Sequence, residues 1–108
     1  MSKIHSVIDR GILEEDPDGV LYLSAKAKDV ITAIEGNARI MASLESKATD
    51  EEDKRIGFWT LFFIKYCGEA SSEEIADGVH VLVGWEQAAK ENRLNEWSMQ
   101  LRFGEGKR

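Results

Sequence analysis

Residues 56–64 carry large apolar side chains on almost every side of a helix. These side chains belong to Ile56, Phe58, Trp59, Leu61, Phe62, Phe63 and Ile64. Thr49 and the carboxylates of residues 50–53 precede the segment, and such residues cap backbone N–H groups and complement the dipole in the first turn of a helix. Gly68 is typical of a helix end. The sequence therefore predicts a helix that runs to about Cys67, packs on several sides and forms the centre of the core.

A long amphipathic helix is expected before this central helix. Ser24 occupies an N-cap position. The residues after it place an apolar stripe on one helical face, made of Ala27, Val30, Ile31, Ile34, Ala38, Met41 and Leu44. Gly36 and Asn37 interrupt the pattern with a turn-prone pair, so we expect a helix over residues 25–47 that bends or splits at this pair.

A third helix is expected after the central one. Ser71 and Glu74 have the spacing of a capping box, which predicts a helix that begins near Ser72. Residues 78–84 are rich in β-branched side chains and bounded by glycines, so a strand is the alternative for this stretch. The helical period of the surrounding residues favours helix.

Two segments predict strands. The turn Asp16-Pro17-Asp18-Gly19 lies between two apolar runs, which predicts a β-hairpin over residues 11–23. Residues 97–103 alternate with the two-residue period of a half-buried strand, and this strand would extend the hairpin to three strands. With a short helix within residues 2–10 and a frayed tail at 104–108, we predict one α+β domain of 108 residues. Three main helices would pack with a small antiparallel sheet.

The acidic residues are bunched in two places. One group is the tip of the expected hairpin and the other is the start of the central helix: Glu14, Glu15, Asp16 and Asp18, and Asp50, Glu51, Glu52 and Asp53. The chain has 20 acidic and 14 basic residues, a formal net charge of −6, which opposes binding to a phosphate backbone. A basic protein surface is the better electrostatic partner, so we expect both groups to contact one. The alternative is that these carboxylates only keep the protein dissolved or start helices.

No motif in the sequence indicates a catalytic centre, a metal ion or a cofactor. His5 and His80 are far apart and lack a neighbouring nucleophile or metal ligand, and we expect His80 in the core or at its boundary and His5 in solvent. Cys67 is the only cysteine, and we expect a buried structural thiol. Tryptophan is enriched at binding hot spots, and Trp97 starts the expected edge strand, so Trp97 is a candidate for partner contact.

Three other functions stay open. A glycine followed by apolar residues, an acidic turn, a strand from Val20 and a long helix follow one another over about residues 7–44, an order similar to the wing and last helix of winged-helix transcription regulators. The resemblance implies DNA binding, although the wing tip here is acidic. Glu73, Glu74 and Asp77, with residues 50–53, are similar to half of the divalent-cation site of all-helical nucleotide pyrophosphohydrolases. Arg55 occupies the place where the other half requires a glutamate. Finally, the chain would be a structural or assembly subunit if the helix over 25–47 formed a homodimer or larger homo-oligomer in which Met41 and Leu44 are buried only on association.

The leading expectation is a small acidic interaction protein that is not an enzyme. It would bind and inhibit or modulate a basic protein, in the manner of immunity proteins, antitoxins or phage-encoded inhibitors, without a cofactor. One cysteine suits a reducing compartment, the first residues lack a secretory signal, and the longest apolar stretch is far shorter than the about 20 residues that cross a bilayer. We therefore expect a cytoplasmic protein that does not bind membranes.

Overall fold

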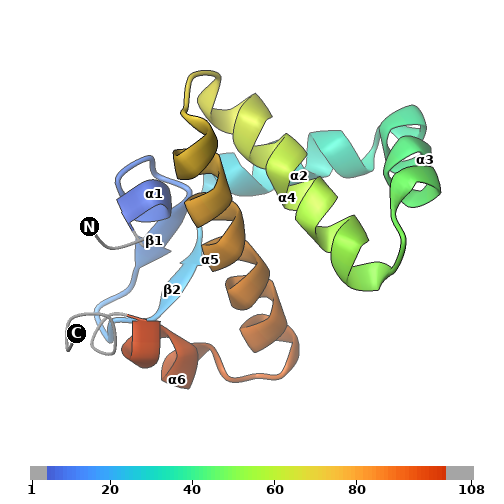
Figure 1. Cartoon of the computed structure of the whole chain (residues 1–108). Helices are drawn as coiled ribbons and strands as arrows, with labels where there is room; N and C mark the ends of the chain where they lie inside the picture. The colour runs from blue at the N-terminus through green and yellow to red at the C-terminus, as the bar shows by residue number, and fades with distance from the viewer. Residues whose placement is uncertain (1–4, 102–108) are drawn as a thin grey trace.

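The computed structural model of the chain describes residues 5–101. Six helices and two strands occur among these residues, in the order α1 (His5–Ile8), β1 (Leu13–Glu15), β2 (Leu21–Leu23), α2 (Ala25–Glu35), α3 (Ala38–Lys47), α4 (Glu51–Cys67), α5 (Ser72–Lys90) and α6 (Leu94–Met99). Figure 1 shows α5 between the hairpin on one side and α4 on the other. The fold is mainly helical with one two-stranded antiparallel sheet, so the α+β class is confirmed.

The central helix predicted from the apolar segment is α4. Its N-cap is Asp50, whose side chain accepts a hydrogen bond from the backbone N–H of Asp53 at 2.7 Å, and Gly68 ends it with a φ of 76°. Its buried side chains are Phe58, Trp59, Phe62 and Phe63. Ile56 and Ile64 are 42% and 48% exposed, so the prediction that α4 packs on nearly every side is wrong at these two positions.

The long helix expected over residues 25–47 is split into α2 and α3. Gly36 ends α2 in a helical conformation, and the Asn37 side chain starts α3 by accepting a hydrogen bond from the N–H of Ile40 at 3.1 Å. The described chain therefore has four helices of ten or more residues, not three. Met41 and Leu44 of α3 are partly buried against the core of the same chain.

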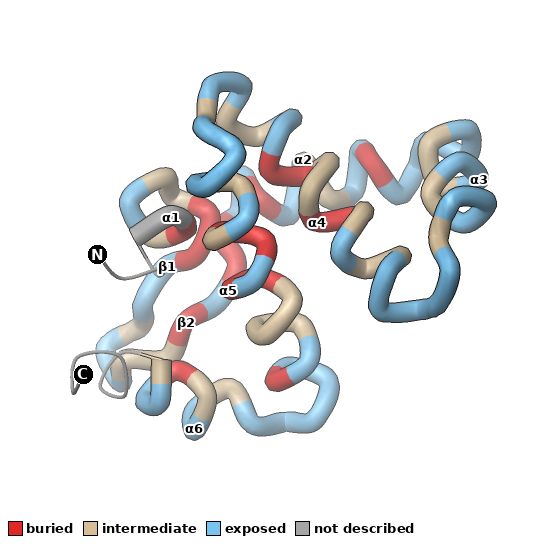
Figure 2. The backbone as a smooth tube through the Cα atoms, in the orientation of Figure 1, coloured by how far each residue is buried: buried red, intermediate tan, exposed pale blue. Residues whose placement is uncertain are grey.

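Residues 78–84 lie within α5, so the strand alternative is excluded. The capping box at Ser71 and Glu74 is present in full and starts this helix. Figure 2 shows the buried residues on α4 and α5 and on the hairpin and α2, which pack against them. Gly78 is buried against Phe63 of α4, and a helix with no side chain at this position can approach the aromatic ring closely.

The hairpin is confirmed, and the third strand is wrong. Strands β1 and β2 pair antiparallel with Leu13 opposite Leu23. Residues 94–99 form α6, and a wider helical turn continues it to Leu101. The free edge of β2 is occupied by side chains, because the backbone N–H of Leu21 donates to Ser98 Oγ at 3.0 Å and Trp85 Nε1–H donates to the Leu21 carbonyl at 3.1 Å. A third strand is therefore not needed to pair the backbone groups of Leu21. The tail expected at 104–108 lies outside the described residues.

Candidate functional site

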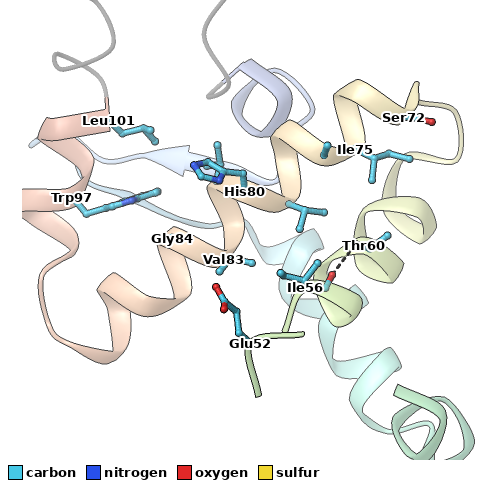
Figure 3. Close-up of a pocket in the computed structure, with 13 residues that line it drawn as sticks. Glu52, Ile56, Thr60, Ser72, Ile75, His80, Val83, Gly84, Trp97 and Leu101 are labelled. Atoms are coloured by element: carbon cyan, nitrogen blue, oxygen red, sulfur yellow. Dashed lines mark hydrogen bonds between the residues drawn. The ribbon is translucent and has the colours of Figure 1, made fainter. Parts of the chain in front are cut away.

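An open apolar groove of about 740 Å³ lies over α5, with α4 along one side and α6 along the other (Figure 3). Side chains from all three helices line it, among them Ile56 of α4, Ile75, Val79 and Val83 of α5, and Trp97 and Leu101. This volume falls within the roughly 300–1,000 Å³ of ordinary ligand sites.

Two polar contacts hold α4 and α5 together beside the groove. Arg55 Nε donates to Glu86 Oε1 at 2.8 Å, and a second guanidinium nitrogen of Arg55 pairs with the other carboxylate oxygen. Trp59 Nε1–H donates to Glu86 Oε1 at 3.2 Å, and the Arg55 guanidinium lies 4.8 Å from the centre of the Phe58 ring. Because the carboxylate of Glu86 bonds two side chains of α4, it fixes the spacing of these helices at the end of the groove where Glu52 lies.

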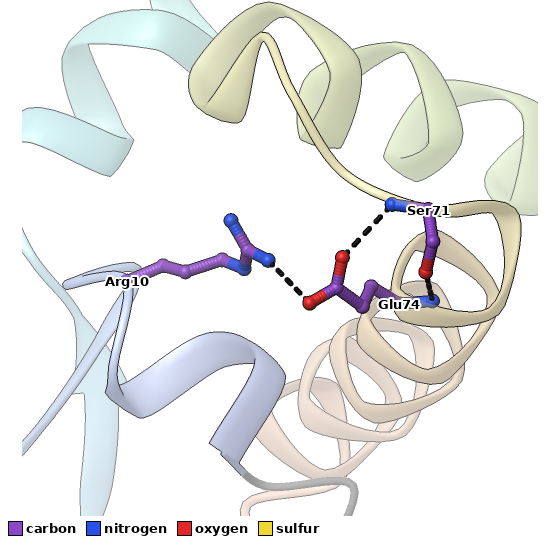
Figure 4. A network of polar contacts seen from close by, with 3 residues as sticks. All are labelled: Arg10, Ser71 and Glu74. Carbon is purple, nitrogen blue, oxygen red and sulfur yellow. Dashed lines mark hydrogen bonds and ion pairs between the residues drawn. The ribbon is translucent and has the colours of Figure 1, made fainter.

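The opposite end of α5 is fixed by a network around Glu74 (Figure 4). The Glu74 carboxylate accepts a hydrogen bond from the backbone N–H of Ser71 at 2.8 Å and pairs with Arg10 at 2.9 Å. The backbone hydrogen bond from Ser71, with a smaller contribution from Arg10, lowers the pKa of Glu74 below its ordinary value. Glu74 therefore has a structural role as the second member of the capping box that starts α5.

The turn before α6 brings Trp97 back onto α5. Asn92 adopts a φ of 58°, and the backbone N–H of Arg93 donates to the Ala88 carbonyl at 2.8 Å, which ends α5 and reverses the chain. Hydrogen bonds from Gln87 and Arg93 lower the pKa of Glu91 in the same turn. Trp97 then lies against Gly84, since a Cβ atom at Gly84 would be 3.1 Å from Trp97 Nε1.

The charge along the groove is acidic. Glu52 lies at one end, exposed and without an ion pair among the described residues, and none of the described lining residues is Lys or Arg. Thr60, Ser72 and His80 supply the remaining polar side chains. His80 is exposed, so the expectation of a core or boundary histidine is wrong, because α5 turns this side chain toward the open groove (Figure 3).

The structure brings together two of the predicted site residues, Glu52 and Trp97, which line the same groove. Asp50 and Asp53 are engaged locally, since Asp50 caps α4 and Asp53 accepts the backbone N–H of Thr49 at 3.0 Å. Glu51 is exposed beside them but does not line the groove. The acidic residues therefore have different roles although they are adjacent in the sequence.

The acidic hairpin tip lies on the other side of α5 from the start of α4 (Figure 1). Glu14, Glu15 and Asp18 are exposed. Asp16 holds the turn, because its carboxylate accepts hydrogen bonds from the backbone N–H groups of Asp18 and Val20, both at 2.9 Å. The two acidic groups do not form one continuous surface.

Neither a metal cluster nor a membrane span is found within residues 5–101. No group of three or more His, Cys, Asp or Glu side chains there is arranged to hold a metal ion. No helix in this range has the length and apolarity to cross a bilayer. Cys67 is half-buried and unpaired, which corrects the expectation of full burial, because it lies in the last turn of α4 next to the exposed Gly68.

Comparisons with known protein families, curated proteins and solved structures gave no match. The assignment of the site therefore rests on the geometry of the groove alone. Sequence reasoning missed Ile56 as a groove residue because it assigned this side chain to the core, and it gave Val83 no role beyond the β-branched stretch 78–84. Their apolar character was visible in the sequence, but which side of each helix stays uncovered depends on how α4, α5 and α6 pack.

Proposed function

We propose that this chain is a small acidic interaction protein, not an enzyme, that binds a basic protein and inhibits or modulates it through the groove over α5. The observation that carries the proposal is an open apolar groove with a carboxylate at one end and no cation among its described lining residues. Protein interfaces combine an apolar centre with aromatic anchors and a polar rim. Ile56, Val83 and Trp97 supply the apolar and aromatic part, and Glu52 supplies the rim.

The net charge of −6 supports a basic partner. Opposite charge raises the rate of association and disfavours acidic competitors. Glu52, rather than the hairpin tip, is the acidic residue best placed to contribute, because it is adjacent to apolar surface that a partner would also cover. The homo-oligomer alternative is less favoured, since Met41 and Leu44 are already packed within one chain.

The test is affinity capture from the native lysate with the wild-type chain and two matched variants. Ile56→Asp places a charge in the groove, and Ile64→Asp makes the same change at a similarly exposed position of α4 outside it. We expect the wild type and Ile64→Asp to capture the same basic protein, Ile56→Asp to lose it, and capture to weaken as salt rises. Equal capture by all three forms would contradict the proposal.

A further inference from the structure

We propose that the groove binds an amphipathic α-helix of the partner, about three turns long, with Lys or Arg at the end that meets Glu52. This inference rests on the proposed function and adds the kind of segment that is recognised. Three features support it: the lack of a free strand edge among the described lining residues, the length of the groove along α5 and the position of Glu52.

The walls of the groove favour a helix over an extended peptide. All of the lining residues named above belong to α4, α5 and the helical segment 94–101, and backbone groups within a helix are paired with one another. An extended peptide of the strand-addition kind binds through main-chain hydrogen bonds to a free strand edge, and the lining residues within 5–101 provide none. An extended peptide on this apolar surface would leave the N–H and C=O groups that face the surface without partners, whereas a helix pairs its own backbone groups.

The edge of β2, the strand that faces α6, does not supply the missing strand edge. The N–H and C=O groups of Leu21 at the edge of β2 are already bonded to Ser98 and Trp85. Strand addition at this residue would have to break both bonds. The groove and the adjoining edge of β2 therefore offer a partner side chains, which suits a helix whose apolar residues recur at i, i+3 or i+4, and i+7.

The length of the groove matches about three helical turns. Its lining on α5 runs from Ser72 to Gly84, a rise of roughly 18 Å at 1.5 Å per residue. Ala76 and Gly84 keep the middle and one end of this floor low, which lets a second helix approach. Trp97 lies beside Gly84, and its indole N–H has no hydrogen-bond partner among the described residues, so it is available to the ligand.

Charge fixes which part of the ligand carries its basic residues. Glu52 belongs to the first turn of α4, near Val83 at the end of the groove away from Ser72 (Figure 3). A Lys or Arg in the last or first turn of the bound helix would meet this carboxylate while its apolar residues cover Ile56 and Val83.

The experiment selects peptides against the full chain from two phage-displayed libraries of equal size. One has a helix-favouring scaffold randomised at i, i+3, i+4 and i+7 and at three terminal positions, and the other is randomised at alternate positions of a strand-favouring scaffold. Selected peptides are synthesised, and their affinities are measured by isothermal titration. We expect binders from the helical library, with bulky apolar residues on one face and Lys or Arg at one end, and a central proline in them to weaken binding at least tenfold.

Matched protein variants locate the binding site. Ile56→Ala should weaken the selected peptides about tenfold, because part of a side chain buried on binding is removed, whereas Ile64→Ala should leave affinity unchanged. Glu52→Gln should weaken binding about two- to fivefold and reduce its salt dependence, whereas Glu51→Gln, one residue away in the same helical turn, should not. Circular dichroism confirms that each variant is folded.

Two results would overturn the inference. Binders that come only from the strand library, or helical binders that are indifferent to Ile56→Ala, would exclude a helix in this groove. The proposed function would survive either result if capture of the cellular partner still required Ile56. If neither library gave binders and Ile56→Asp also left capture unchanged, the inference and the proposed function would both be refuted.

Discussion

Replacing Gly78 by alanine should destabilise the fold, although alanine is the better helix former. Gly78 is buried in α5 where this helix meets α4, and a Cβ atom there would lie 2.1 Å from Cε2 of Phe63 and 2.8 Å from two further atoms of the ring. Ordinary contacts begin at 3.4 Å, so the ring would have to move by roughly 1 Å. Phe63 has 0% of its surface exposed, and a close-packed core offers little room for that movement.

The magnitude follows from two opposing effects. Adding a methyl group to a well-packed core costs typically about 1–3 kcal/mol and sometimes more, and this overlap is severe. The higher helix propensity of alanine offsets about 1 kcal/mol of this loss of stability. We expect a net decrease of about 2 kcal/mol in the free energy of unfolding, which for a chain of this size lowers Tm by roughly 10 °C.

Urea denaturation followed by circular dichroism measures this change, with Gly57→Ala as the control. Gly57 is also a glycine inside a helix, but a Cβ atom there meets only the tip of the Leu44 side chain at 3.3 Å, and Leu44 is half-buried and can shift. Gly57→Ala should therefore be neutral or up to about 1 kcal/mol more stable. If Gly78→Ala were as stable as the wild type, the close packing of α5 on Phe63 would be refuted.

Three further predictions concern hydrogen bonds. Ser98→Ala leaves the buried N–H of Leu21 without its acceptor and should cost about 1–3 kcal/mol in chemical denaturation, and an unchanged midpoint would contradict that bond. Asp50→Ala should lower the free energy of unfolding by about 1 kcal/mol, and Asp50→Asn should lower it much less, because asparagine is an equally good N-cap. Equal decreases in Tm for the two variants would contradict the capping role of Asp50. The pKa of Glu74 is lowered in the folded state, so its carboxylate stabilises the fold above pH 4.5. This contribution is lost as pH falls through the folded-state pKa. Glu74→Gln should therefore make the free energy of unfolding less dependent on pH in acid. The prediction would be contradicted if the free energy of unfolding of the two forms fell equally steeply with pH in acid.

The parts of the fold that depend on local chemistry were predictable. Ser24, Asn37 and Ser71 each accept a backbone N–H within three residues, so their effect is visible in a short stretch of sequence. The Asp16-to-Gly19 turn is local in the same way, because Asp16 bonds to residues two and four positions ahead. These signals located the hairpin and the starts of the long helices.

The third strand failed because the deciding contact is not local. Residues 97–103 alternate as a strand would, but Ser98 is bonded to Leu21, 77 positions away in the sequence. The Ser98 hydroxyl and the indole of Trp85 bond the backbone groups of Leu21 that a third strand would have paired. Nothing in the local period distinguishes a strand that pairs with β2 from a helix that covers its edge.

The candidate site was only partly predictable for a related reason. Glu52 and Trp97 were singled out for charge and for aromatic character, and both line the groove. Ile56 is apolar like its buried neighbour Phe58, but it lines the open groove and is exposed. Exposure of an apolar residue is a property of the packed helices, so the sequence alone assigned Ile56 to the core.

Closure of the hairpin edge and formation of the groove depend on the same short helix. Ser98 of α6 is buried at β2, and the preceding residue, Trp97, lies on a different side of α6 against Gly84. Neighbouring residues of a helix point about 100° apart, so one side chain can face the sheet while the next lines the groove. The bond from Leu21 to Ser98 therefore holds one wall of the groove in place. Loss of that bond should loosen Trp97 and weaken ligand binding before the α4 and α5 core unfolds, which links a buried backbone amide of the sheet to recognition at the surface.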